Sequence, residues 1–100
     1  MKNLIVGNKM KLYPTAHNSK ANSQLPYYEI KGQEVYPTIH NNDDDYGLPV
    51  FKIKDNELYP TMHNDKYLSG VSAFEIKNDQ IYPTQSNPID SFGVPLFEIK

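Results

Sequence analysis

The tripeptide Tyr-Pro-Thr recurs in this chain at a fixed interval of 23 residues, beginning at Tyr13, Tyr36, Tyr59 and Tyr82. A second phrase keeps the same period and consists of an aromatic residue, a charged residue, Ile and Lys, at 28–31, 51–54, 74–77 and 97–100. Self-similarity at a short fixed period is typical of repeat proteins. In such proteins each copy buries its apolar face against its neighbours, so the period constrains the fold strongly.

Each copy is predicted to form a β-hairpin in which a short turn joins the two phrases. Pairs of turn-forming residues lie between the strand ends at 32–33, 55–56 and 78–79. Gly, Asn and Asp tolerate the positive φ that two-residue type I′ turns require. Such turns place each Lys opposite the residue three positions later, so we expect exposed ion pairs at Lys31–Glu34 and Lys54–Glu57. For the N-terminal copy we expect strands at 4–6 and 11–15.

Period-two alternation gives every hairpin one apolar and one polar face. In the second copy the apolar face carries Pro26, Tyr28, Ile30, Val35, Pro37 and Ile39, and the polar face carries Tyr27, Tyr36, Thr38 and His40. In the third copy Met62 falls on the apolar face. Because a lone two-stranded hairpin is marginally stable in water, the apolar faces are predicted to pack together in one core.

The proline of each Tyr-Pro-Thr strand limits how the hairpins join. Pro37 falls at a non-hydrogen-bonded position of its own hairpin, so the missing N–H donor lies on the outer edge. We therefore expect successive hairpins to pack as separate blades or to meet through an interrupted ladder. The last strand, 94–100, has no following Tyr-Pro-Thr strand. It is expected to close onto the N-terminal region or to pair with another molecule.

The loops between hairpins also follow the repeat. Gly47, Gly70 and Gly93 share one position, which indicates a backbone turn that favours glycine. The next position is apolar in every copy, and each of these side chains is predicted to point inward: Leu25, Leu48, Val71 and Val94.

The fold prediction is a single all-β domain over 1–100, built of tandem hairpin repeats of period 23. The predicted units are approximately 4–25, 26–48, 49–71 and 72–93, followed by a terminal strand at 94–100. They would form a small pseudo-fourfold or solenoid-like body.

Composition excludes several classes of function. The net charge is −2, the ten basic residues are all Lys, and there is no Cys. Neither a basic nucleic-acid-binding face nor a thiolate site is supported. The apolar run at 4–6 is too short to cross a membrane. We expect a soluble, cytoplasmic protein without a cofactor, and no nucleic-acid or membrane partner.

The repeated tyrosines are candidate binding residues, because alternation places Tyr13, Tyr36, Tyr59 and Tyr82 on the polar face. Phenol rings in this pattern stack on sugars or form a protein-binding stripe. The structural alternative is that each ring covers the neighbouring hairpin.

Three histidines, His17, His40 and His63, also share one repeat position, where Ser86 stands in the fourth copy. Three equivalent imidazoles resemble a zinc site. However, equivalent positions in a continuous sheet lie about 10 Å apart, too far to share one ion. The favoured interpretation is that each His and its following Asn order the corner between strand and loop.

No catalytic motif is present, and no residue is predicted to be catalytic or to bind a metal. The leading functional hypothesis is a non-catalytic binding or assembly module with a repeated Tyr, Thr and His surface. Its partner would be a protein, another copy or a different chain, bound through that surface or through the C-terminal edge strand, with a homodimer as one form. The alternatives are a carbohydrate-binding module and a His-based metalloprotein.

Overall fold

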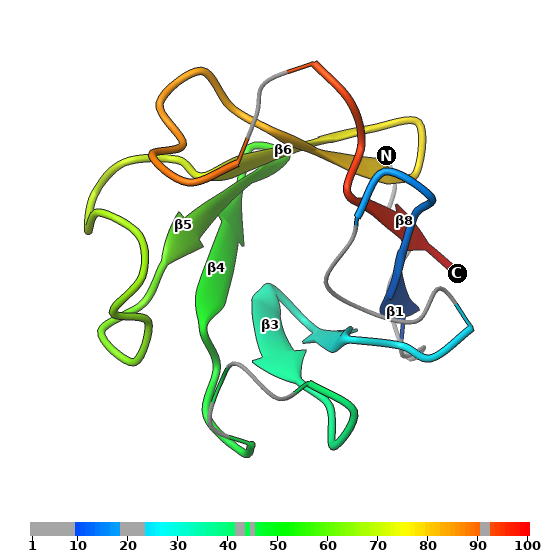
Figure 1. Cartoon of the computed structure of the whole chain (residues 1–100). Helices are drawn as coiled ribbons and strands as arrows, with labels where there is room; N and C mark the ends of the chain where they lie inside the picture. The colour runs from blue at the N-terminus through cyan, green and yellow to red at the C-terminus, as the bar shows by residue number, and fades with distance from the viewer. Residues whose placement is uncertain (1–9, 19–23, 42–43, 45, 91–92) are drawn as a thin grey trace.

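The computed structural model describes residues 10–18, 24–41, 44, 46–90 and 93–100. It contains β1 (Met10–Pro14), β2 (Tyr28–Lys31), β3 (Glu34–Pro37), β4 (Phe51–Lys54), β5 (Glu57–Pro60), β6 (Phe74–Lys77), β7 (Gln80–Pro83) and β8 (Phe97–Ile99). These eight antiparallel strands follow one another around a closed barrel, in which β8 lies beside β1 (Figure 1). The all-β hairpin fold is confirmed. Of the two arrangements left open, the closed pseudo-fourfold body is correct.

The hairpins have the predicted register. Lys31 pairs with Glu34, Ile30 with Val35 and Tyr28 with Pro37, and the β4–β5 and β6–β7 hairpins repeat this pattern. Asp55 and Asn56 have φ of 51° and 64°, and the equivalent turn at 78–79 has 51° and 63°. Positive φ at both central residues is the type I′ geometry that the turn residues predict. The turn at 32–33 has positive φ at Gly32 alone, 62°, so the type I′ prediction is wrong there, and the turn has the φ pattern of type II′, which places Gly first.

Neighbouring hairpins meet through a shorter ladder. β3 and β4 pair at two positions, Glu34 with Lys52 and Val35 with Phe51, whereas β2 and β3 pair at four. Pairing between the hairpins stops before Pro37, whose nitrogen has no proton to donate. The interrupted ladder is therefore confirmed, and the alternative of separate blades is wrong.

The centre of the barrel is a ring of four aromatic side chains, one from each hairpin. Successive ring centroids are 6.1 Å apart for Tyr28 and Phe51, 5.6 Å for Phe51 and Phe74, 6.4 Å for Phe74 and Phe97, and 5.4 Å for Phe97 and Tyr28. Each pair is edge-to-face, the arrangement that the aromatic quadrupole favours. Buried aliphatic side chains from the alternate strands complete the core: Leu12, Val35, Leu58 and Ile81.

The fourth hairpin is assembled from β8 and β1. The backbone N–H of Lys11 donates to the carbonyl of Lys100 at 3.1 Å, and the N–H of Lys100 donates to Lys11 at 2.9 Å. The predicted closure of the last strand onto the N-terminal region is thus confirmed. The strand expected at 4–6 lies outside the described residues. β8 pairs with the edge of β1 that the strand at 4–6 was expected to occupy.

The prediction that Ile39 and Met62 belong to the buried face is wrong, because these side chains are 72% and 92% exposed. Alternation holds only within a strand, and β3 and β5 end at Pro37 and Pro60. The chain turns directly after each proline, so the following side chains leave the barrel.

The prediction that the apolar residue after each loop glycine position points inward is also wrong. Leu25, Leu48 and Val94 are 40%, 42% and 39% exposed. The buried side chains lie two residues further on in three copies and include Tyr27, which was assigned to the polar face: Tyr27, Val50 and Ala73. Each of these residues donates its N–H to a strand of the preceding hairpin, which draws its side chain into the core. Gly47, Gly70 and Gly93 have the expected positive φ of 99°, 84° and 119°.

No segment that the structure describes forms a helix with the length and apolar character needed to cross a membrane.

Candidate functional site

The four repeated tyrosines are half-buried on the outside of the barrel. Each ring is covered on one face by the ammonium of the Lys paired beside its strand, with Nζ 4.9 Å from the centroid for Tyr36, 5.6 Å for Tyr59, 5.4 Å for Tyr82 and 5.3 Å for Tyr13. These are cation–π contacts. Because β1, β3, β5 and β7 alternate with the other strands around the barrel, the rings form separate patches around its circumference instead of one row.

The predicted ion pairs are replaced by contacts to tyrosine. Lys31 and Lys54 lie over tyrosine rings, while Tyr36 Oη donates to Glu34 Oε1 at 3.0 Å and Tyr59 Oη donates to Glu57 Oε1 at 3.1 Å. Each tyrosine thus separates the Lys from the Glu. The hydrogen bond to the carboxylate raises the pKa of Tyr36 and of Tyr59 above the usual 10.0, because it favours the protonated phenol.

The structure keeps the three histidines apart. His17, His40 and His63 are exposed at equivalent corners of different hairpins. Each contributes its backbone N–H, which donates to the Thr Oγ1 two residues earlier at 3.2 Å. Within the described ranges no three His, Cys, Asp or Glu side chains are placed to hold a metal ion.

The Thr and Asn of each corner form a hydrogen-bonded clamp. Thr61 Oγ1 donates to the Pro49 carbonyl at 2.6 Å, and Asn64 Nδ2 donates to the Val50 carbonyl at 3.0 Å. The same bonds recur in every copy, including Thr15 to Pro95 and Asn18 to Leu96. The interpretation of the repeated Asn as a corner residue is therefore confirmed, whereas the His imidazole takes no part in these bonds.

A groove on the outside of the barrel brings two predicted site residues together. It has a volume of about 540 Å³ and is lined along one side by Tyr59, Thr61, Met62 and His63. Glu34, Lys52 and Lys54 line it from the neighbouring strands. Sequence reasoning missed the role of Met62, because alternation assigned it to the core. At the equivalent position Ile39 is also exposed, whereas the other copies carry Ala16 and Gln85.

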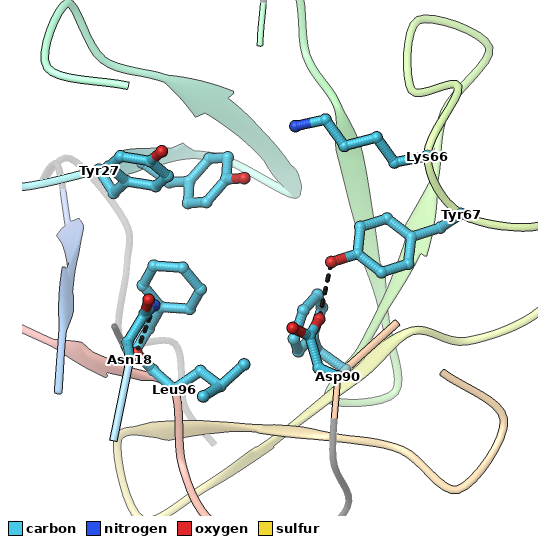
Figure 2. Close-up of a pocket in the computed structure, with 9 residues that line it drawn as sticks. Asn18, Tyr27, Lys66, Tyr67, Asp90 and Leu96 are labelled. Carbon is cyan, nitrogen blue, oxygen red and sulfur yellow. Dashed lines mark hydrogen bonds between the residues drawn. The ribbon is translucent and has the colours of Figure 1, made fainter. Parts of the chain in front are cut away.

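A second site, the axial pocket, is a cavity of about 40 Å³ beside the four central aromatic side chains (Figure 2). Asp44, Tyr67 and Asp90 occupy one repeat position, 23 residues apart. Tyr67 and Asp90 line the pocket, and Asp44 is hydrogen-bonded to Tyr28, which also lines it. Tyr67 Oη donates to Asp90 Oδ2 at 2.8 Å, and Tyr28 Oη donates to Asp44 Oδ2 at 2.9 Å. Lys66 Nζ lies 3.0 Å from Asp44 Oδ1.

Burial and the Asp44 carboxylate together raise the pKa of Tyr28 well above 10.0, so its phenol stays protonated. Sequence reasoning missed the axial pocket. The shared repeat position of Asp44, Tyr67 and Asp90 was a signal, but their convergence depends on closure of the barrel.

Comparison with known proteins assigns no family. No protein-family model matches the chain, and no match was found among curated proteins or solved structures.

Proposed function

We propose that this protein is a cytoplasmic, non-catalytic binding module that takes an extended protein segment in the outer groove between hairpins. The observation that carries the proposal is Met62, which is 92% exposed and lines a groove of about 540 Å³ together with Tyr59 and His63. Methionine is common at binding surfaces because its flexible thioether adapts to different partners.

The charges of the groove favour an acidic partner. Two ammonium groups, Lys52 and Lys54, line it, with one carboxylate, Glu34. A segment that combines an apolar anchor with a nearby Asp or Glu would place the anchor on Met62 and the carboxylate near the lysines. The charges would then contribute more to association rate and specificity than to affinity.

The barrel presents a related surface more than once. Tyr36, Ile39 and His40 repeat the arrangement of Tyr59, Met62 and His63, with an apolar side chain that is 72% exposed. A partner with two such segments would gain avidity from the high effective concentration of the second site. The C-terminal strand is a weaker candidate for partner binding, because β8 is paired on both edges, with β7 and β1, and has no open edge for a partner strand.

A carbohydrate ligand is the weaker alternative, because an ammonium already covers one face of each repeated tyrosine. A sugar stacked on that face would have to displace it. A metal-dependent role is not supported, because the described part of the chain contains no cluster of three His, Cys, Asp or Glu side chains that could hold a metal ion.

The test begins with a displayed library of random peptides selected on the wild-type protein, followed by affinity measurement of the selected peptides. Met62→Ser should weaken binding by about tenfold, the effect expected when an apolar anchor of an interface is lost. Leu68→Ser is the matched control, because Leu68 is 60% exposed but does not line the groove. It should leave the affinity unchanged.

The proposal fails if no peptide is selected, or if the two variants weaken binding equally. Light scattering across the same concentrations identifies a second copy as the partner. Binding on a glycan array that Tyr59→Ala abolishes would replace the proposal with the carbohydrate alternative.

A further inference from the structure

The axial pocket is a separate site from the outer groove, and its walls are largely aromatic. The rings that line it come from Tyr27, Tyr28, Tyr67, Phe74 and Phe97. The cavity of about 40 Å³ is larger than the roughly 10–15 Å³ that one water needs. It is only partly enclosed, so a bound group could extend from it into solvent.

Asp90 supplies a carboxylate oxygen to this pocket. Its Oδ2 accepts bonds from Tyr67 Oη at 2.8 Å and from Asn87 Nδ2 at 3.4 Å. Its Oδ1 accepts no bond from the residues that the structure describes. Figure 2 shows the Asp90 carboxylate below the Tyr67 hydroxyl, at the edge of the open centre of the pocket.

The charge balance around the pocket is negative. Lys66 is paired with Asp44 at 3.0 Å, and the side chain of Asp44 is only 8% exposed. This pair is neutral as a unit, and among the residues that the structure describes no cation forms an ion pair with Asp90. The faces of aromatic rings carry negative partial charge and attract cations. An anion would be repelled by the Asp90 carboxylate and would gain little from the Lys66 ammonium, which Asp44 already neutralises.

We propose that the axial pocket binds the terminal ammonium of a primary alkylamine, with Asp90 as its ionic partner. The ammonium donates to Asp90 Oδ1, and the first carbon atoms of the alkyl chain pack among the aromatic rings. The group comes from a free small amine or from a lysine side chain of a partner protein.

The test is a titration of the full chain followed by two-dimensional amide NMR, with ethylammonium chloride as the probe and sodium chloride as the salt control. Saturable shifts are expected at Asp90, Tyr67 and Asn18. Nα-acetyl-lysine methylamide tests the protein source, since it carries the same ammonium on a peptide unit. Stronger binding of this probe would indicate a lysine from a partner, and stronger binding of ethylammonium a free amine.

Variants separate a specific site from general electrostatics. Asp90→Asn should weaken ethylammonium binding by about tenfold or more, or 1.4 kcal/mol. Asp65→Asn removes the same charge from an exposed position and should leave binding unchanged. Lys66→Gln leaves the Asp44 carboxylate without its ion-pair partner and should strengthen binding, so it gives a result in the opposite direction even if Asp90→Asn fails to fold.

Three results would overturn the proposal. They are the absence of saturable shifts at high millimolar ethylammonium, equal effects of Asp90→Asn and Asp65→Asn, and weaker binding by Lys66→Gln. Binding of acetate at the same residues would assign the pocket to anions instead. None of these results bears on the outer groove, whose test depends on Met62.

Discussion

Three hairpins of this barrel are closed by a two-residue turn, and the fourth is closed by contacts alone. The turnless hairpin, β8 with β1, repeats the pairing of the others: Phe97 lies opposite Pro14 as Tyr28 lies opposite Pro37. Its Thr15 and Asn18 form the same clamp that Thr61 and Asn64 form. The side-chain pattern is therefore sufficient to specify the pairing, and the turn is not required for it.

The two kinds of hairpin differ in how they are held closed. A turn brings its strands together locally, whereas β8 and β1 must close a loop of nearly the whole chain, at a larger entropic cost. The turnless hairpin also places Lys11 opposite Lys100, where two of the covalent hairpins place Glu opposite Lys. We expect the β8–β1 pair to open more readily than the others.

The largest expected effect on stability comes from truncating one of the four aromatic side chains at the centre of the barrel. Phe97→Ala in the turnless hairpin and Phe74→Ala in a covalent one should each lower the free energy of unfolding by about 3–5 kcal/mol, because both side chains are buried. Urea denaturation measures both. A cost for Phe97→Ala below half of that for Phe74→Ala would show that the two hairpins are not equivalent.

A disulfide across each kind of hairpin sharpens the comparison. Lys11→Cys with Lys100→Cys should stabilise the oxidised protein by about 2–4 kcal/mol, because it closes a very long loop. Lys54→Cys with Glu57→Cys closes only a short loop and should stabilise it less.

The two disulfide variants are matched, because each removes one Lys that covers a tyrosine ring. The measurement is the midpoint of thermal unfolding, oxidised against reduced. Equal gains for the two disulfides would contradict the account.

The next effect concerns Tyr28, which carries the only hydroxyl group among the four aromatic side chains at the centre of the barrel. Tyr28→Phe makes this position like Phe51, Phe74 and Phe97, but it removes the 2.9 Å hydrogen bond to Asp44. The expected loss near neutral pH is about 1.5–3 kcal/mol, the usual value for a hydrogen bond to a charged group.

This loss should depend on pH. The pKa of Tyr28 is raised in the folded protein, so its contribution is complete below the unfolded value of 10.0 and is lost as pH rises above it. The difference between wild type and Tyr28→Phe should therefore narrow above pH 10 in urea denaturation. A constant difference would exclude this linkage.

The smallest effect is electrostatic. Lys11→Glu places a carboxylate opposite Lys100, in the register in which Glu34 lies opposite Lys31. It should stabilise the protein by about 0.2–1 kcal/mol, less at high salt. Gln80→Glu makes the same kind of pair with Lys77 in a covalent hairpin and serves as the control. A gain for Gln80→Glu but none for Lys11→Glu would indicate that Lys100 does not lie opposite position 11.

Much of the fold could be predicted from local rules. The turn residues at 55–56 fix the register, alternation within strands identifies Val35 and Leu58 as core, and Pro37 explains where the ladder between hairpins stops. These features depend on nearest neighbours in sequence, which the repeat displays directly.

The remaining features depend on closure of the barrel. Ile39 and Met62 leave the core because the chain turns after the proline, and alternation contains no information about the end of a strand. Tyr67 and Asp90 meet only because the loops of different repeats converge at one end of the barrel. The contacts of Lys31 reflect competition between a carboxylate and an aromatic face, which the strand register does not decide.

β8 closes the barrel on β1 within one molecule. Leu12 and Ile99 form a non-hydrogen-bonded pair next to the bonded pair Lys11 and Lys100, so their α-protons should be close. We expect a nuclear Overhauser effect between these α-protons that is as strong as the one between the α-protons of Val35 and Ile30 and independent of protein concentration. Its absence, while the Val35–Ile30 signal is present, would contradict the closed barrel.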